Sequence, residues 1–492
     1  MKTYYTETLI IGAGPAGLAC AMELSRKGKD FIVLEKDLAP GGLSKTYRFT
    51  EDDGSIFLTD NGPHRFFSKN PYLYDFIGSI LGDDWIKVKR YTRQYIDGKF
   101  YDYPINAFQA LWNIGPIKST LIFTDYIAAK IKFDLRKQPI NNFRDYIEAH
   151  FGKRLGEFNM INYTEKIWGI PAETIHQDWA KQRIKGLDLR TVTTDLLKKV
   201  FRIKHHTDTT SLIDEFYYPA KGSGEIYEKI VHTLKKKKYT VHFDCQVTEI
   251  RSVTSVDGKG FETEIMLNGE KCIILSKYLV ESVPITQFFK ILKPSAPDEV
   301  ADALTKLKYR NQVYLFITLD KPSLSKDQWI YLPNKEIPFG RISEMRNFSK
   351  KMSPPGKTSL FIEFFCTEGD KIWNMTKEEL FESSFPHMKK MRLFSRDHVR
   401  QIYLIKQKNV YPVYDLSYEE HAKKATSYLD SIENLYAIGR PGRFRYNNQD
   451  HSLEMGMLAA KSIIEGKRYD LDTIGNEKDH YENGNLVAKR RK

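Results

Sequence analysis

The chain has 492 residues, of which 41% are hydrophobic and 28% are charged. These fractions are typical of a globular protein of about three folding units and exclude a fibrous or intrinsically disordered chain. Lysine and arginine outnumber aspartate and glutamate by 76 to 63, and the net charge of +13 favours anionic partners such as nucleotides, phosphates or a membrane surface. No nucleic-acid motif accompanies the basic runs, so we expect no nucleic-acid partner.

Cysteine usage indicates a reducing compartment. The four cysteines are scattered, without a CxxC pair or the spacing of metal ligands, and predict no metal site. The chain opens on a strand pattern rather than on a signal peptide, and no apolar run approaches the ~18 residues that a transmembrane helix needs. We therefore expect a cytoplasmic protein without a membrane span.

The first 35 residues predict a strand, a glycine turn, a helix and a second strand. The strand Thr8–Ile11 leads into Gly12-Ala-Gly14-Pro-Ala16-Gly17, and a helical pattern follows to Lys27. The apolar run Phe31–Leu34 then forms the second strand, which ends at Glu35. This order of elements predicts a βαβ unit that binds a dinucleotide.

The spacing of the glycines has a physical reason. Gly12 permits the tight turn, Gly14 lets the backbone approach a pyrophosphate, and Gly17 permits close packing of helix on strand. Glu35 stands where a carboxylate binds ribose hydroxyls, which disfavours the 2′-phosphate of NADP and leaves NAD or FAD.

A second glycine turn distinguishes FAD from NAD as the predicted cofactor. Glu35-Lys36 is followed by Gly41-Gly42-Leu43-Ser44, which resembles the second fingerprint of the FAD-dependent amine-oxidase and mutase superfamily. Two successive glycines allow backbone N–H groups to point at an anion. The sequence therefore predicts FAD as the cofactor.

The remaining elements indicate an α/β fold in which a Rossmann-type FAD domain is joined to a helical insert and an antiparallel β-sheet substrate domain. Helical periods with interrupting prolines fill the region after Pro104, and alternating strand patterns dominate from Val313 to Leu404. We expect FAD-binding segments at 1–90, 217–295 and 429–470, sheet segments at 91–104 and 296–428, a helical insert at 105–216, and a basic tail at 471–492.

Four motifs, in order along the chain, resemble the UDP-galactopyranose mutase family. They are Asn61-Gly-Pro-His64-Arg-Phe-Phe67, Lys99-Phe-Tyr-Asp-Tyr103-Pro104, Tyr163-Thr-Glu-Lys-Ile-Trp168, and Gly439-Arg440-Pro-Gly-Arg-Phe-Arg-Tyr446 with Asn448-Gln-Asp450-His-Ser452. Each motif is weak alone, but four in order on a flavin fold indicate the family over residues 8 to 465.

The resemblance implies a FAD domain, a helical bundle and a six-stranded antiparallel sheet. It also implies a nucleotide-sugar substrate, whose pyranose and furanose forms are interconverted through an adduct at N5 of the reduced flavin. NAD(P)H or another donor would reduce the flavin.

The resemblance also assigns residues to the site. His64 and Arg440 would be catalytic. The residues expected to bind FAD are Gly12, Gly14, Ala16, Gly17, Glu35, Lys36, Gly42, Leu43, Ser44, His64, Val247, Gly439, Arg440, Asp450 and Met455. Those expected to bind substrate are Arg90, Thr92, Tyr103, Trp168, Tyr411, Arg440 and Tyr446. Structural alternatives remain open, since Arg440 could serve only the FAD pyrophosphate, Trp168 could be core, and His64 could be a loop histidine.

Two departures from the family pattern keep a second function open. Pro63 replaces a glycine in the Gly-Gly-His loop and stiffens it. The mutases grip the diphosphate with an arginine on a strand of the substrate sheet, but Val313–Leu319 contains none. The alternative is an FAD-dependent oxidoreductase of the protoporphyrinogen-oxidase and amine-oxidase type. The oligomeric state cannot be read from the sequence.

Overall fold

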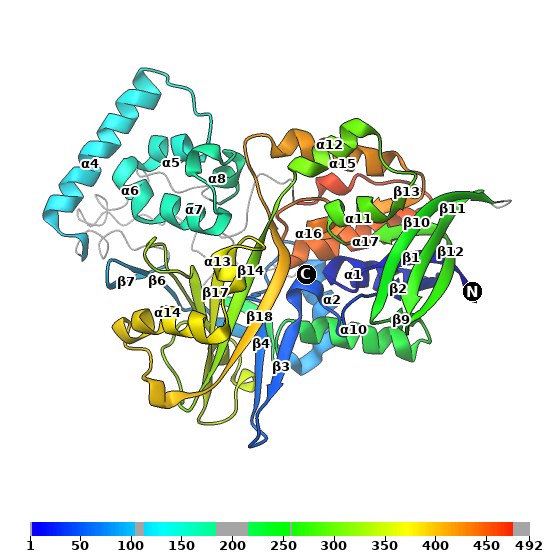
Figure 1. Cartoon of the computed structure of the whole chain (residues 1–492), viewed down its shortest axis with the longest axis horizontal. Helices are drawn as coiled ribbons and strands as arrows, with labels where there is room; N and C mark the ends of the chain where they lie inside the picture. Colours follow the sequence, from blue (N-terminus) through cyan, green and yellow to red (C-terminus); the bar gives the residue numbers. More distant parts are fainter. Residues whose placement is uncertain (1, 104–112, 184–214, 256–257, 476–492) are drawn as a thin grey trace, which may run out of the picture.

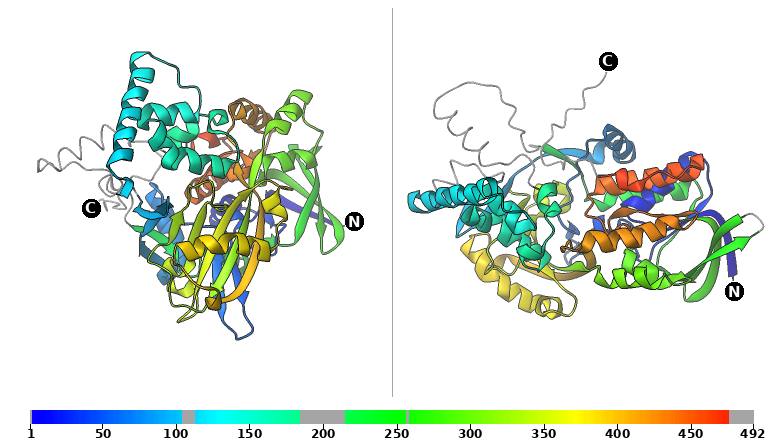
Figure 2. Two further views of the ribbon diagram at one scale, coloured as in Figure 1. Left: turned by 60° about the vertical axis from the view of Figure 1, so that its left-hand side comes forward. Right: turned by 90° about the horizontal axis from the view of Figure 1, so that it is seen from above.

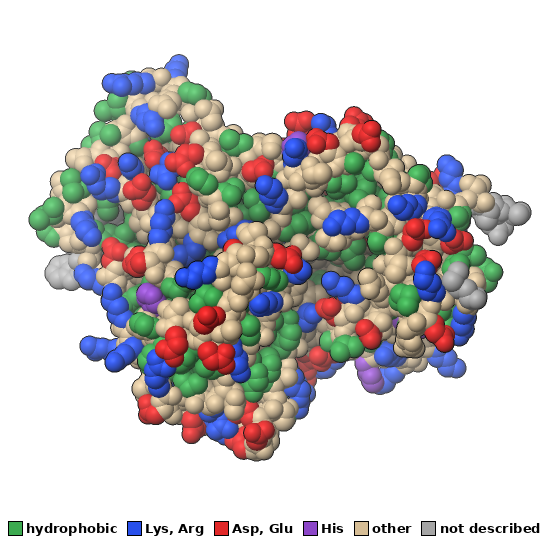
Figure 3. Space-filling view, viewed as in Figure 1, with side chains coloured by type: hydrophobic (Ala, Val, Ile, Leu, Met, Phe, Trp, Pro, Cys, Tyr) green, Lys and Arg blue, Asp and Glu red, His purple; other side chains and the backbone are tan. Residues whose placement is uncertain are grey.

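The protein is represented by a computed structural model that describes residues 2–103, 113–183, 215–255 and 258–475. Two large sheets form the frame of the molecule, and a group of helices stands beside them (Figure 1). On the face shown in Figure 3, lysine and arginine side chains mix with aspartate and glutamate.

The first sheet is the nucleotide-binding type that the βαβ pattern predicts. β1 (Lys2–Ile11) lies between two parallel neighbours, β2 (Phe31–Leu34) and β12 (Glu270–Glu281). The remaining strands of this sheet are β9 (Thr240–His242), β19 (Leu435–Ala437), β13 (Leu292–Lys293) and the antiparallel pair β10 (Cys245–Ser255) and β11 (Gly258–Leu267). β9 pairs in parallel with β2 and β19 in parallel with β12, whereas β11 pairs antiparallel with β12.

Helices cover both faces of this sheet, as a parallel sheet requires. One face carries α1 (Pro15–Arg26), α10 (Gly224–Lys236), α17 (Gln449–Glu465) and α2 (Pro71–Leu81), which bury an apolar core with β1 and β2. The other face carries α11 (Ile285–Ile291), α12 (Asp298–Lys306) and α15 (Tyr418–Ser431).

The second sheet has the strand order β18-β14-β17-β16-β15-β6-β7. Its strands are β18 (Val399–Pro412), β14 (Tyr309–Leu319), β17 (Thr358–Cys366), β16 (Arg341–Glu344), β15 (Trp329–Tyr331), β6 (Thr92–Ile96) and β7 (Lys99–Asp102). α14 (Lys377–Lys390) covers its outer face. The hairpin β3 (Thr46–Thr50) and β4 (Ile56–Asp60), with β5 (Trp85–Lys89) and β8 (Glu215–Pro219), packs on the inner face.

The helical insert stands beside the second sheet (Figures 1 and 2). Its described helices are α4 (Pro116–Lys130), α5 (Phe143–Phe151), α6 (Lys153–Gly156), α7 (Asn162–Trp168) and α8 (Asp178–Arg183). A helix expected at Ala107–Trp112 lies outside the described residues. In the described segments no helix has the length and apolar character needed to cross a bilayer.

The predicted fold class is confirmed, but three details were wrong. In the described residues the second sheet has seven strands rather than six, one pair of which, β15–β6, is parallel. α12 and α15, expected within the sheet domain at 296–428, pack on the nucleotide-binding sheet because their apolar faces meet Ile285, Phe288 and Leu435 there. The expected tail begins inside the folded body, where Leu471 is buried and Asp472 pairs with Arg443 at 2.6 Å.

Candidate active site between the two sheets

A cavity of about 820 Å³ extends from the carboxyl ends of β1 and β2 to the inner face of the second sheet. One end is walled by the two glycine turns and by Glu35. The other is walled by the loop 61–67, by strands β14 to β16 and by the segment 439–449. Ligands of α/β folds bind at the carboxyl ends of the strands, so the position fits a nucleotide cofactor.

The two glycine turns face each other at one end of the cavity. A methyl group added at Gly42 would lie 3.4 Å from the Cα atom of Gly14, and one at Gly14 would lie 3.9 Å from the Cα atom of Gly42. Gly41 N–H also donates to the Ala13 carbonyl at 2.8 Å. Bare backbone therefore lines this passage from both sides, which suits a pyrophosphate.

Glu35 lies at the end of β2 and is 7% exposed. Its carboxylate accepts hydrogen bonds from the Ala13 N–H at 2.8 Å and from the Asp37 N–H at 2.9 Å. Burial raises the pKa of Glu35, and these two donors oppose the rise. The acid thus stabilises the first glycine turn and stands beside it where a ribose would lie.

A buried acid at the start of α17 points to a second polar contact. Asp450 is 3% exposed and lines the cavity, and its Oδ1 atom has no hydrogen-bond partner within the described part of the chain. Burial raises the pKa of Asp450 to about 7. An unpaired buried polar atom at a helix N-terminus fits a polar edge of a bound flavin.

Arg440 lines the opposite end of the cavity. Its Nε donates to the Asn447 carbonyl at 2.8 Å and its Nη1 to the Val410 carbonyl at 3.2 Å. The guanidinium lies 4.8 Å from the ring centre of Tyr446 and 5.5 Å from that of Tyr411, and the two rings stack on each other at 5.5 Å. These carbonyl and ring contacts hold a positive charge at the cavity wall.

A second arginine lines the cavity from β16. Arg341 makes a bidentate ion pair with Glu363 of β17, with N···O distances of 2.5 and 2.6 Å, and Glu363 is 0% exposed. Glu363 also accepts from Gln312 Nε2 at 3.2 Å, and Gln312 accepts from the Tyr314 hydroxyl at 2.7 Å. The network fixes the orientation of the guanidinium.

His64 stands between these two arginines. Its Nε2 atom lies 3.1 Å from the Asn61 carbonyl, which can only accept, so Nε2 carries the proton. Burial, together with the positive charges of Arg440 and Arg341, lowers the pKa of His64 to about 4. The ring is therefore neutral at pH 7.

Most of the predicted site residues share this cavity. Those on its wall are Gly12, Gly14, Ala16, Glu35, Lys36, Gly42, Leu43, Ser44, His64, Val247, Gly439, Arg440, Asp450, Tyr411 and Tyr446. Within the described structure, six others lie behind the wall: Gly17, Met455, Arg90, Thr92, Tyr103 and Trp168.

Four of these six residues contact residues of the wall. Trp168 is 1% exposed in the core of the helical insert, where it packs on Trp179 at 4.7 Å and lies behind Tyr411. Thr92 pairs in register with Trp329, and the Tyr103 ring contacts the ring of Tyr331 at 5.2 Å. Met455 accepts a hydrogen bond from Asn447.

Several wall residues were missed by sequence reasoning. Arg341, Gln312, Trp329 and Tyr331 lie on strands of the second sheet, and Arg65 lies in the predicted His64 loop with its guanidinium 5.7 Å from the Trp329 ring. The alternating pattern of these strands could have indicated polar positions on one face. It could not show which face meets the cavity.

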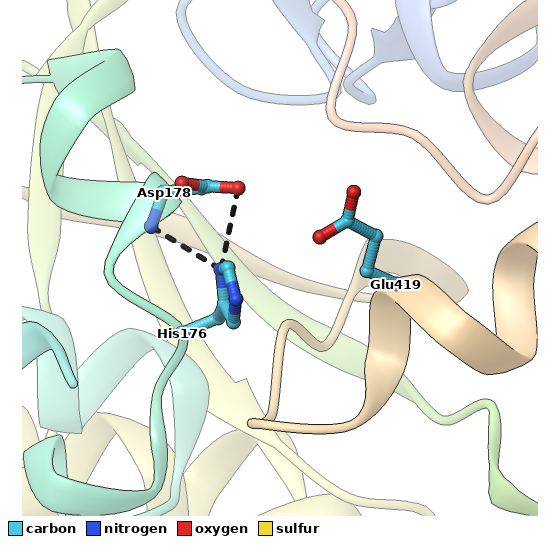
Figure 4. Close-up of side chains that lie close together, drawn as sticks. All are labelled: His176, Asp178 and Glu419. Carbon is cyan, nitrogen blue, oxygen red and sulfur yellow. Dashed lines mark hydrogen bonds and ion pairs between the residues drawn. The ribbon is translucent and has the colours of Figure 1, made fainter. Parts of the chain in front are cut away.

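One group of metal-type side chains lies apart from the cavity. His176, Asp178 and Glu419 place one ligand atom each within 4.8 Å of one another (Figure 4). His176 Nδ1 is already contacted by the Asp178 N–H and carboxylate, both at 3.3 Å. The group joins the helical insert to the first turn of α15.

A two-sheet fold with a glycine-lined nucleotide passage and a polar chamber beyond it defines a class of flavoproteins. The model of the family described as flavin containing amine oxidoreductase matches residues 15–404. The chain belongs to this family and is an FAD-dependent enzyme.

Solved structures share the fold. A reduced UDP-galactopyranose mutase matches 96% of this chain and 98% of its own, with a TM-score of 0.80 and 24% identity. A putative protoporphyrinogen oxidase from Exiguobacterium sp. 255-15 covers 94% of this chain and 99% of its own, with a TM-score of 0.69 and 14% identity. A putrescine oxidase bound to putrescine covers 94% and 100%, with a TM-score of 0.60 and 15% identity.

A curated relative matches over a short stretch. The flavin-dependent L-tryptophan oxidase RebO of Lentzea aerocolonigenes is 35% identical over 80 residues, which are 16% of this chain and 17% of that enzyme. The similarity therefore spans a small part of that oxidase.

Proposed function

We propose that this enzyme interconverts the pyranose and furanose forms of a nucleotide sugar, with reduced FAD as its cofactor. The observation that carries the proposal is the guanidinium of Arg440, held by two carbonyls and by the rings of Tyr411 and Tyr446 at the wall of the chamber. A half-buried cation in that position favours an anionic substrate.

The charges around Arg440 support the same substrate class. Arg65 and Arg341 line the same end of the cavity, and Glu363, outside the wall, offsets the charge of Arg341. Among the described acids on that wall, Glu368 pairs with Lys408 at 2.5 Å, and burial raises the pKa of Asp450 to about 7. Two opposite charges 4 Å apart attract by about 4 kcal/mol in partly desolvated surroundings, and like charges repel equally. A diphosphate therefore fits this chamber better than a protonated amine.

The ring pair gives a second argument against an amine substrate. Aromatic faces attract cations, and an amine could use Tyr411 and Tyr446 in that way. The two rings stack on each other, and Arg440 already lies over both. The faces of these two rings thus bind an arginine of the protein itself rather than a substrate amine.

Val313–Leu319 contains no arginine that could bind a diphosphate, and Arg341 can take this role instead. It lies on the second sheet, as the mutases' diphosphate arginine does, but it comes from β16. We assign Arg341 and Arg440 to the two phosphates, and Glu363 to orienting Arg341.

We assign other residues of the cavity wall to the bound cofactor. The bound flavin supplies the reaction chemistry, since its reduced form is a nucleophile and its oxidised form accepts hydride. Gly14 and Gly42 would face its pyrophosphate, Glu35 its ribose, and Asp450 its polar ring edge. His64, neutral at pH 7, lines the chamber with its Nε2 atom on the Asn61 carbonyl.

Product analysis tests the proposal. Dithionite-reduced enzyme is incubated with a panel of UDP- and dTDP-sugars, and furanose products are separated by chromatography. We expect product only after reduction, without oxygen uptake. Peroxide formed one-for-one with product from an amine or a porphyrinogen, and no furanose from any sugar, would instead establish the oxidoreductase alternative.

A further inference from the structure

The outer face of α4 is apolar. α4 continues into a π-helical turn, Ile131–Leu135, and this stretch holds six of the eleven large hydrophobic side chains that are exposed in the described residues. They are Ile117, Leu121, Phe123, Ile127, Ile131 and Leu135. Ile117 and Leu135, near the two ends of this stretch, are 78% and 76% exposed, and exposed Thr120 and Thr124 lie between the apolar positions.

These side chains share one face of the helix. Phe123, Ile127 and Ile131 follow one another at four-residue spacing, and such residues form a stripe along a helix. The opposite face is also apolar, because Ala129 and Phe133 are buried there against Ala149 of α5. A helix that is apolar on both sides requires a cover for its outer face.

Basic residues border the apolar stripe. Lys118 and Lys132 lie on one margin and Lys130 on the other, and exposed Arg136 and Lys137 follow the last turn. The three lysines have only loose surface partners, at 3.8 Å from Asp97, 3.8 Å from Glu148 and 3.5 Å from Asp134. Pairs of this kind contribute little and can be exchanged for other anions.

α4 also occupies an edge of the molecule. It forms the outer side of the helical insert in the views of Figures 1 and 2, and Lys118 lies 3.8 Å from Asp97 in the β6–β7 turn of the second sheet. Figure 3 shows hydrophobic and basic side chains side by side over this corner.

We propose that α4 attaches the enzyme to an anionic lipid surface, lying in the interface with its apolar stripe among the acyl chains. Apolar side chains between basic margins match acyl chains beneath anionic headgroups. A second copy of the chain fits less well, because lysines on both margins of the stripe would meet lysines of the copy.

Vesicle flotation tests this attachment. The FAD-loaded full chain is mixed with vesicles of phosphatidylcholine and phosphatidylglycerol, or of phosphatidylcholine alone, and floated on a density gradient. We expect flotation with the anionic vesicles and a loss at high salt, because the basic margins are screened. The double variant Phe123→Ser/Ile127→Ser should lower the partition coefficient by on the order of tenfold or more.

The matched control removes exposed apolar side chains elsewhere. Tyr5→Ser/Leu416→Ser changes two residues that are 75% and 51% exposed, and it should float like the unmodified chain. Flavin absorbance and melting temperature verify that each variant is folded. A Phe123→Trp variant should shift its emission to the blue on anionic vesicles.

Three results would overturn the proposal. The first is equal flotation of the α4 variant and the control, and the second is no flotation of the unmodified chain. The third is a dimer in light scattering that Phe123→Ser/Ile127→Ser dissociates without any vesicle effect, which would assign the stripe to a second copy.

Discussion

The guanidinium of Arg440 is held by two carbonyls and two rings, so its side chain is ordered before any ligand arrives. A charge-assisted contact from such a group is worth about 2–3 kcal/mol, or ~30–150-fold in affinity. Arg440→Ala should lose that much affinity for UDP, measured by tryptophan fluorescence, while FAD affinity changes little. Equal loss of both ligands would assign Arg440 to the cofactor alone.

The matched control for Arg440 is an exposed arginine outside the cavity. Arg396 pairs with Glu382 at the surface, at 2.6 Å. Arg396→Ala should therefore leave UDP and FAD affinity unchanged. Arg440→Lys keeps the charge but loses the planar fork, so its UDP affinity should fall between those of the two alanine variants.

His64 should make folding stability depend on pH in a defined direction. Its pKa is about 4 in the folded protein, lowered by burial and by Arg440, and about 6.5 in an unfolded chain. Between these values the unfolded chain binds a proton that the folded one does not, so stability is lost as pH falls from 6.5 towards 4. His64→Asn, which can still donate to Asn61, should show a smaller drop in melting temperature between pH 7.5 and pH 5. If the unmodified protein and His64→Asn show the same drop in melting temperature between pH 7.5 and pH 5, folding does not lower the pKa of His64.

At the scale of elements, two glycines three residues apart should respond differently to the same change. A methyl group at Gly17 would lie 2.0 Å from the Gly12 carbonyl oxygen, so α1 would have to move off β1. A methyl group at Gly14 meets nothing nearer than 3.9 Å, but it enters the passage towards Gly42. Gly17→Ala should destabilise the fold by about 1–3 kcal/mol or more.

Gly14→Ala should instead retain the melting temperature of the cofactor-free protein and lose FAD affinity. Thermal melts of both cofactor-free variants, with flavin-fluorescence titrations, separate the two effects. A destabilised Gly14→Ala that binds FAD normally would show that the passage does not hold the pyrophosphate.

At the scale of the whole molecule, FAD should connect the parts that wall the cavity. The wall draws on the first sheet, the second sheet and the segment 439–449, so a ligand there binds only the folded chain. The enzyme should purify yellow, with FAD released by heat. At a hundredfold excess over its Kd, FAD should add about 2.7 kcal/mol, which raises the melting temperature by roughly 3 °C. FMN lacks the adenylate half and should give a smaller rise.

Much of the nucleotide-binding half could be predicted from the sequence because its signals are local. Gly12, Gly14 and Gly17 lie within one turn, and Glu35 follows at the end of the next strand, so short-range geometry already places them together. The closing motif around Arg440 is similarly contiguous. Backbone conformation alone fixes the relation of such residues, and the glycine turns, Glu35, Arg440 and Tyr446 all reached the cavity wall.

The residues that line the cavity from the second sheet could be identified only from the tertiary structure. Arg341 becomes a wall residue only because β16 pairs with β17 and brings it to Glu363, and no local pattern reports that pairing. The same register places Thr92 behind Trp329, and the packing of the insert places Trp168 behind Tyr411. The sequence by itself thus determined a flavin-binding turn and the charge that accompanies it. Which side chains line the other half of the cavity depended on contacts between strands distant in the chain, because these contacts set which face of each strand meets the cavity.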